Sequence, residues 1–275
     1  MSLVFAAIAP HGGLAIAEAC KPEERELAAS TRRAFEELGR RSATARPDTV
    51  VVLTPHNVHV EGSMAVVVAG SLEGRLERTP VELRASCDRE LATAIRAELR
   101  AAGLPAIGIS FGGNDVATAV HPMDWAVLIP LWFLGGRADP PVRVVAISPA
   151  RELTPAQQVA AGRAIAAAAE RSAARVALVA SADHGHGHSE AGPYGYSAQS
   201  APYDRLVVEL VGGNRLRELL DFDPAWVAAA TADSWWQMLV LHGALGESWE
   251  GELLSYEAPT YFGMLCAAYR PAVPN

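Results

Sequence analysis

The sequence predicts a single α/β domain over residues 1–275, with a mostly parallel or mixed central sheet and helices on both of its faces. Short apolar runs rich in β-branched residues or alanine alternate with longer helical patterns along most of the chain. Half of the 275 residues are hydrophobic, which is enough for one large core. Beyond richness in alanine, no repeat or low-complexity tract interrupts this alternation. Strands separated by helices of this length typically form a sheet that is covered on both sides.

The predicted strands are short runs bounded by Gly, Pro or Asp, as is typical of buried strands. They are Leu3–Ala9, Thr49–Thr54, Met64–Ala69, Pro105–Ser110, Val142–Ser148, Val176–Ser181 and, late in the chain, Glu252–Glu257.

The predicted helices carry charges on one face and Leu, Ala or Ile on the other, or begin with capping residues. Thr154 followed by Pro155 is a capping pair that opens an alanine-rich helix. The helices are Pro22–Arg41, Asp88–Ala102, Pro155–Ser172, Pro202–Val211, Leu216–Leu220, Pro224–Ala230 and Asp233–Leu245. The Gly- and Ser-rich stretch 185–200 is the longest irregular segment, and we expect it to form a loop or lid over a site.

Composition argues against several classes of protein. The formal charge of −8 and the scattered Lys and Arg residues provide no basic face for a nucleic acid or an anionic membrane. Cys20, Cys87 and Cys266 are odd in number and far apart, which indicates a reducing, cytoplasmic environment. No apolar run is long enough for a membrane span, no signal peptide is recognised, and GxGxxG, P-loop and GxSxG motifs are absent.

Six of the eight histidines lie in three segments that directly follow predicted strands: APHGG at 9–13, TPHNVH at 54–59 and SADHGHGH at 181–188. The carboxyl ends of parallel strands open onto one crevice, so these loops converge on a single site. A lone histidine at a strand end usually caps a carbonyl, but two at matched positions, His11 and His56, favour a bound metal with an acid/base partner nearby. His59 would point away from His56, so we interpret it as supporting or structural.

Five motifs resemble one family. PHGG, VVVLTPH, SADHGH, GPYGY, and HGAL followed by ELLSYEAPTYFG occur in the order found in class III extradiol ring-cleavage dioxygenases, the LigB-like family of the protocatechuate 4,5-dioxygenase catalytic subunit. The likeness spans nearly the whole chain and is greatest to the Memo-related branch. It implies an oxidoreductase that holds a non-haem Fe(II) and cleaves a catechol-like or aminophenol-like aromatic ring with O₂. A zinc-dependent non-oxygenase, or a Memo-like metal-binding protein that uses the same cleft, is the alternative.

The resemblance implies two histidine ligands and one carboxylate ligand. It transfers the histidine roles to His11 and His56, and the carboxylate role to Asp233 at the start of a helix that ends in GAL. Glu257, in SYEAP, is the alternative carboxylate. Both acids also have ordinary explanations, Asp233 as a helix cap and Glu257 as a solvated or salt-bridged acid.

The third histidine segment provides the expected proton carrier. His186 matches the family's catalytic histidine, and an imidazole that titrates near neutrality both accepts and donates a proton. Asp183 is expected to orient one of the neighbouring rings. His184 and His188 remain further options, because on an extended loop both share a face with His186 and would form a small metal site of their own.

One stretch departs from the family pattern. Ring-cleaving members usually carry a histidine in an Asp-His-Gly run, and here the matching residues are Asp124-Trp125-Ala126. Trp125 donates one hydrogen bond but does not act as an acid or base at neutral pH. His121 is either the source of that imidazole from a shifted position or an ordinary loop residue restrained by Pro122. The expected partners are a small aromatic substrate and O₂, and a homodimer is the default assembly.

Overall fold

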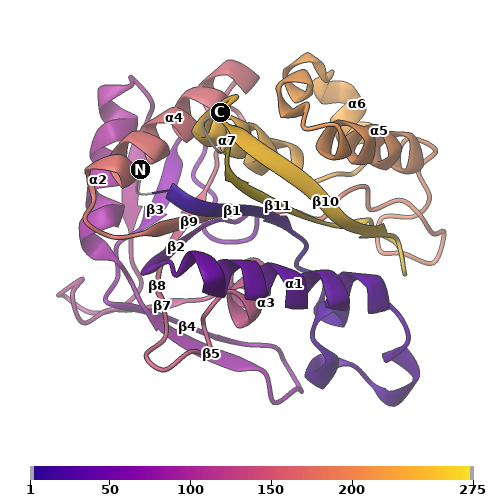
Figure 1. Ribbon diagram of the computed structural model, residues 1–275, viewed down its shortest axis with the longest axis horizontal. Coiled ribbons are helices and arrows are strands. Elements are labelled where there is room, and N and C mark those ends of the chain that lie inside the picture. The colour runs from indigo at the N-terminus through magenta and orange to yellow at the C-terminus, as the bar shows by residue number, and fades with distance from the viewer. Residues whose placement is uncertain (1–2, 273–275) are drawn as a thin grey trace.

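The computed structural model describes residues 3–272 and contains an eight-stranded mixed sheet, with strand order β10-β11-β1-β9-β2-β8-β3-β6 (Figure 1). Strands β1, β9, β2 and β8 are parallel neighbours, whereas β11 is antiparallel to β1 and β3 is antiparallel to β8. The strands of this sheet are β1 (Leu3–Ala9), β2 (Thr49–Leu53), β3 (Met64–Val67), β6 (Ala106–Ile109), β8 (Arg143–Ser148), β9 (Val176–Ser181), β10 (Trp249–Glu257) and β11 (Met264–Pro271). The predicted α/β fold with a mixed central sheet is therefore confirmed.

Helices pack on both faces of the sheet, as predicted (Figure 1). They are α1 (Ala29–Ala45), α2 (Arg89–Ala101), α3 (Trp125–Phe133), α4 (Pro155–Arg171), α5 (Ser200–Gly212), α6 (Pro224–Ala229) and α7 (Trp235–Leu245), with shorter 3₁₀ turns that include η3 (Pro22–Glu24) and η4 (Leu216–Asp221). In β2, Val51 and Leu53 face the core of α2, α4, α5 and α7, while Val50 and Val52 face the core of α1 and α3. Because both faces are covered, the strand is buried at every position and apolar after Thr49.

A second sheet, with strand order β5-β4-β7, lies below the main one and was not predicted (Figure 1). Its strands are β4 (Ser71–Arg75), β5 (Glu82–Ser86) and β7 (Val120–Pro122). In β5, exposed charged residues alternate with buried Leu83 and Ala85, so the strand lacks the continuous apolar run that marks a buried strand. Helix α3 was also missed, because WAVLIPLWF is apolar all round and contains Pro130.

The first helix begins later than predicted. Residues 22–24 form the 3₁₀ turn η3, and α1 starts only at Ala29, after Ala28 in the left-handed region at a φ of 55°. A left-handed alanine does not continue an α-helix, so the break at Ala28 is a backbone feature that side-chain periodicity does not reveal. Strand β11 was missed because its Cys- and Ala-rich interior lacks β-branched residues.

The three cysteines are free thiols, and two of them are buried. Burial raises the pKa of Cys87 to about 12 and also raises the pKa of Cys266. We therefore expect a thiol reagent at pH 8 to modify about one cysteine per native chain, at Cys20, and all three after denaturation. Mass spectrometry after labelling would identify the sites. Rapid native labelling of Cys87 or Cys266 would contradict the described packing.

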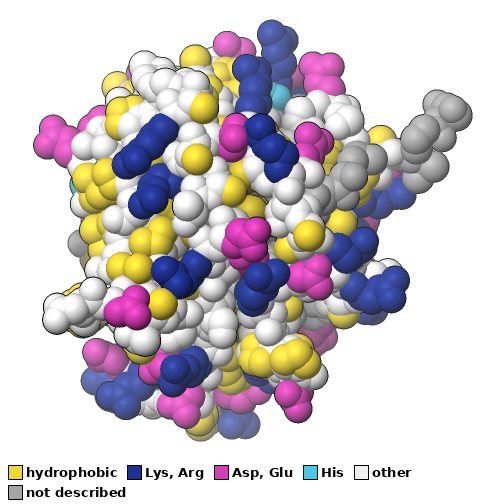
Figure 2. Space-filling model, turned by 90° about the vertical axis from the view of Figure 1, so that its left-hand side faces the viewer, with side chains coloured by type: hydrophobic (Ala, Val, Ile, Leu, Met, Phe, Trp, Pro, Cys, Tyr) yellow, Lys and Arg dark blue, Asp and Glu magenta, His cyan; other side chains and the backbone are white. Residues whose placement is uncertain are grey.

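Charges of both signs mix on the surface. On the face drawn in Figure 2, basic, acidic and apolar side chains are interspersed, and no continuous basic patch is present there. Within residues 3–272, no helix combines the length and the apolar character needed to cross a membrane.

Candidate metal centre

Three side chains from distant parts of the chain meet at the carboxyl ends of β1 and β2. They are His11, His56 and Asp233, the only group among the described residues whose donor atoms are arranged to hold a metal ion. Nε2 of His11 lies 3.1 Å from Nε2 of His56 and 3.6 Å from Oδ2 of Asp233. The third side of the triangle, from Nε2 of His56 to Oδ2 of Asp233, is 3.2 Å.

This triangle has the size that a bound ion requires. Ligands about 2.1 Å from an ion, at roughly 90–110° to one another, are about 3.0–3.5 Å apart. Two imidazoles and one carboxylate on the same side of an ion form a facial triad, a donor set that suits Fe(II) and leaves positions open for other ligands. Zinc accepts the same donors, so the geometry fits a divalent metal without selecting between the two.

The sequence around each donor explains its placement. His11 lies two residues past the end of β1, His56 three residues past β2, and Asp233 two residues before α7. Gly12 follows His11 directly, and its φ of −69° suits any residue. The reason for glycine is packing, because a Cβ at this position would lie 2.6 Å from the ring of Phe262.

Nearby polar groups hold the donors in orientation. Nδ1 of His11 is 3.0 Å from Oγ of Ser181, which leaves Nε2 directed at the other two donors. Asp183 accepts a hydrogen bond from the backbone N–H of His11 (2.9 Å). The backbone N–H of Asp183 in turn donates to Oδ1 of Asp233 (3.2 Å), so Oδ2 of Asp233 is the oxygen directed at the histidines.

The electrostatics of the group favour a cation. Burial alone lowers the pKa of His11, but the carboxylates of Asp183 and Asp233 outweigh it and raise the pKa to about 9. Burial raises the pKa of Asp233, yet hydrogen bonds from His11 and His56 dominate and hold it below its usual range. Burial also raises the pKa of Asp183, against the opposing charge of His11. A proton bound by His11 occupies the place that a metal ion would take, so we expect metal binding to release protons.

His186 lies near this group, and its ring has a defined tautomer. Its Nδ1 lies 2.9 Å from the backbone oxygen of Thr231, and a carbonyl oxygen only accepts hydrogen bonds, so Nδ1 carries the hydrogen in the neutral ring. Nε2 is then the basic nitrogen. The imidazole is stacked on Phe262 and touched at its edge by Tyr194. It is close enough to Asp183 and Asp233 to lower the pKa of both.

The neighbouring histidines do not form a metal site with His186. The ring of His184 is fully buried, neither of its nitrogens has a hydrogen-bond partner among the described residues, and burial lowers its pKa to about 4. His188 points instead at Asp204, with Nε2 2.8 Å from the carboxylate. The three-histidine site that alternation along an extended loop suggested is therefore wrong.

Trp125 contacts one of the three donors, whereas His121 contacts the residue that follows that donor. The indole of Trp125 is stacked on the ring of His56, with 4.4 Å between ring centroids, and remains 47% exposed. His121 is buried in β7 and does not touch the three donors. Its Nε2 is 2.8 Å from Oδ1 of Asn57, the residue after His56, and burial lowers its pKa.

Glu257 lies apart from the three donors. One oxygen of its carboxylate accepts hydrogen bonds from the backbone N–H (2.6 Å) and the hydroxyl (2.8 Å) of Thr31 in α1. The geometry therefore places Asp233, and not the alternative acid Glu257, beside the two histidines.

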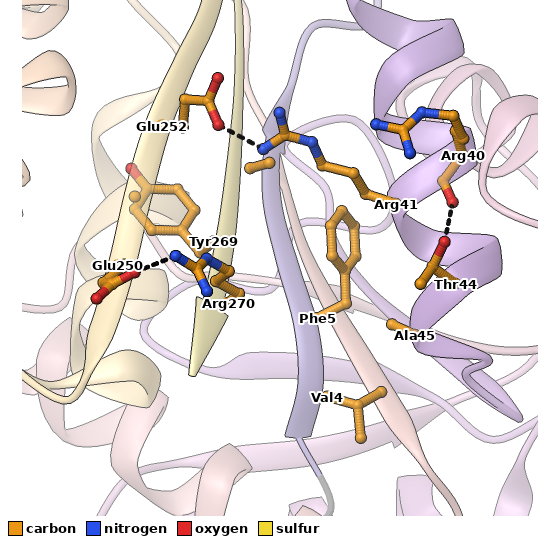
Figure 3. A pocket seen from close by; sticks show the side chains of 12 residues that line it. Val4, Phe5, Arg40, Arg41, Thr44, Ala45, Glu250, Glu252, Tyr269 and Arg270 are labelled. Atoms are coloured by element: carbon orange, nitrogen blue, oxygen red, sulfur yellow. Dashed lines mark hydrogen bonds and ion pairs between the residues drawn. The ribbon is translucent and has the colours of Figure 1, made fainter. Parts of the chain in front are cut away.

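A cavity of about 540 Å³ lies elsewhere, between α1 and strands β10 and β11 (Figure 3). It reaches the start of β1 at Val4 and Phe5, whereas His11 lies beyond the other end of that strand. Two of its arginines already pair with glutamates of β10: Arg41 with Glu252 at 2.7 Å and Arg270 with Glu250 at 2.6 Å. The cavity thus carries no unbalanced charge from these pairs.

Sequence reasoning missed two residues that contact the His186 segment. Thr231 accepts the hydrogen bond from the His186 ring through its backbone oxygen. The pattern of side chains in a sequence gives no indication of such a contact. Asp204 is almost fully buried in α5. Here a signal existed, since Tyr203, Asp204, Val207 and Leu210 share one helix face, and an acid on an apolar face is uncommon.

Comparison with known proteins gives matches to a family model, a curated protein and a solved structure. A family model described as the catalytic LigB subunit of aromatic ring-opening dioxygenase matches residues 5–265. Protein CA_C1420 of Clostridium acetobutylicum is 24% identical over 264 residues, which make up 94% of this chain but only 55% of that protein. The chain thus spans about half the length of this curated relative. The crystal structure of the uncharacterized protein JW3007 from Escherichia coli K12 has a TM-score of 0.63 at 18% identity, covering 96% of this chain and 99% of that one.

Proposed function

The chain belongs to the family of the catalytic LigB subunit of aromatic ring-opening dioxygenases, and from this premise we propose that it is an extradiol dioxygenase dependent on non-haem Fe(II). Its proposed substrates are O₂ and a catechol-like or aminophenol-like aromatic. The main support is the triangle of His11, His56 and Asp233, whose donor atoms lie 3.1–3.6 Å apart. Three donors on one side of an ion leave room for both substrates.

In this proposal His11, His56 and Asp233 hold the ion. When bound, the ion supplies positive charge that lowers the pKa of a ring hydroxyl and a template that places the aromatic ring beside O₂. The rings of Tyr194, Tyr261 and Phe262, which surround His186, provide an aromatic wall against which a flat substrate stacks.

His186 is the proposed proton carrier. Its Nδ1–H is bonded to Thr231, so Nε2 is available to accept a proton from the substrate hydroxyl and to return it later. Asp183 is the proposed orienting group, because it holds the His11 backbone and binds Asp233 through its own N–H. For His121 we propose support of the loop carrying His56, through its contact with Asn57.

One observation favours a second candidate. Trp125 stands where ring-cleaving relatives usually carry a histidine, and its indole covers one side of His56. A zinc-dependent non-oxygenase, or a Memo-like metal-binding protein, would use the same three donors without needing that imidazole.

Oxygen consumption separates the two candidates. Protein purified anaerobically and loaded with Fe(II) is expected to consume O₂ when catechol or 2-aminophenol is added, with a new visible absorbance from the ring-opened product. Zinc-loaded protein is the matched control and should consume none, because Zn²⁺ has no redox chemistry. Tight zinc binding, together with an iron form that is inert toward a panel of catechols and aminophenols, would contradict the dioxygenase proposal.

A further inference from the structure

The segment that carries His186 is attached to a buried carboxylate outside the metal centre. Asp204, on the inner face of α5, is 1% exposed. Its Oδ1 accepts a hydrogen bond from the backbone N–H of Gly185 (2.7 Å), and its Oδ2 contacts Nε2 of His188 (2.8 Å) and the hydroxyl of Tyr256 (2.6 Å). Burial of a carboxylate costs free energy unless its oxygens are hydrogen-bonded. The three short contacts meet this requirement at Asp204.

Two of these three contacts lie on either side of His186. Gly185 immediately precedes it and His188 follows two residues later, so Asp204 holds the backbone at one end of the short stretch that displays the imidazole and the His188 ring at the other end. The same stretch is also held by Ser200 of α5, whose hydroxyl accepts a hydrogen bond from the N–H of Gly187 (2.9 Å).

The glycines of this region are packed so closely that a side chain at these positions would have no room. A Cβ at Gly185 would lie 2.7 Å from Cβ of Ser200, and a Cβ at Gly263 would overlap the carboxylate of Asp204. The two glycine segments also bond to each other, since the N–H of Gly263 donates to the oxygen of Gly185 (3.2 Å). The alternation of His and Gly in HGHGH is thus explained by close packing against α5 and the turn before β11.

We propose that Asp204, together with His188 and Tyr256, is a positioning group that fixes the tautomer and direction of the His186 ring. The His186 ring stays on the carbonyl of Thr231 only while its backbone is held, because Thr231 lies in the separate segment before α7. If the peptide at Gly185 rotates, Nδ1 leaves that carbonyl and the carbonyl no longer fixes the tautomer of the ring. The catalytic consequence rests on the proposed function, whereas the tautomer is measurable without turnover.

The test compares Asp204→Asn with wild type by ¹⁵N NMR of the histidine rings, using His186→Gln to assign the His186 signals. An asparagine of nearly the same shape retains one acceptor but presents an NH₂ group to the donors of His188 and Tyr256. We expect the wild-type ring to show the Nδ1–H tautomer and the variant to show a mixture of tautomers. Asp221→Asn, at an exposed acid at the end of η4, is the matched control and should leave the spectrum unchanged.

Turnover provides the second readout. In Asp204→Asn we expect kcat to fall by about 10–100-fold, the loss typical of partners that orient a functional histidine. Metal content and KM should stay within about twofold, because the three donors are untouched. If Asp204→Asn does not fold, Tyr256→Phe is measured in its place. This variant removes one of the three hydrogen bonds to the Asp204 carboxylate and should show the same changes at smaller size.

The outcomes separate the two proposals. An unchanged His186 tautomer in folded Asp204→Asn or Tyr256→Phe overturns the positioning role, whatever the activity. A changed tautomer in a wild-type protein that cleaves no aromatic ring supports the positioning role and rejects the dioxygenase assignment. A kcat loss that appears only through lower stability, with the tautomer intact, assigns Asp204 a merely structural role and also rejects the proposal.

Discussion

Asp233→Ala is expected to abolish tight metal binding, and His11→Ala is expected to do the same. Each change removes one corner of a triangle whose sides measure 3.1–3.6 Å, so two donors remain where three are needed. Loss of a residue that merely orients a ligand typically costs about 10–100-fold in metal affinity, so loss of a ligand should cost at least about 100-fold. Elemental analysis of anaerobically purified protein, followed by titration with Fe(II) or Zn(II), measures the effect.

Glu257→Ala is the matched control, because it removes the other acid that the sequence offers as a ligand. Its carboxylate is bound to Thr31, so we expect metal content to stay at the wild-type level. The free energy of unfolding should fall by about 1–3 kcal/mol, the usual contribution of hydrogen bonds to a charged acceptor. Metal loss in Glu257→Ala, with metal retained in Asp233→Ala, would reverse the assignment of the carboxylate.

The central sheet could be predicted because its strands follow one simple rule. Buried parallel strands read as continuous apolar runs, and the six runs predicted from Leu3 to Ser181 start and end within two residues of the observed strands. The same rule fails where burial is one-sided or where alanine replaces β-branched residues. It therefore missed β5, with its alternating charges, and β11, whose apolar interior is largely Ala and Cys.

The meeting of His11 and His56 could be predicted because both follow strands of the same parallel set. His11 and His56 both lie just past the carboxyl ends of parallel strands, and β9 lies between those strands. The carboxylate was harder, because Asp233 comes from the start of a helix distant in sequence, and only its place before the GAL ending favoured it over Glu257. The three-dimensional placement separates the two acids, with Glu257 on Thr31 and Asp233 beside His56.

The contacts that orient these side chains could not be predicted. The tautomer of His186 depends on a backbone oxygen 45 residues away, at Thr231, and side-chain patterns carry no information about such a contact. Likewise, His184, His186 and His188 alternate in sequence, but the chain bends at His186 and His188, and the three rings lie in different surroundings. Alternation predicts a shared face only on a regular extended strand.

The tautomer of His186 leads to the second large effect. His186→Gln is expected to retain the metal and to lower kcat by about 10²–10⁴-fold, the usual contribution of a general acid or base. Glutamine still forms hydrogen bonds, but it does not bind a proton at neutral pH, so the change removes proton transfer while keeping a polar side chain. Oxygen uptake by iron-loaded protein at saturating catechol measures kcat, and elemental analysis measures the metal.

His59→Gln is the control for this prediction, since His59 follows the same strand as His56 but is half exposed and paired with Glu152 at 3.1 Å. Its kcat and metal content should remain within about twofold of wild type. The comparison separates binding from chemistry, because His186 contacts Thr231 and aromatic rings and is not among the three donors. If His186→Gln loses its metal as His11→Ala does, His186 is a ligand, and the division between two histidines that hold the ion and one that moves the proton is wrong.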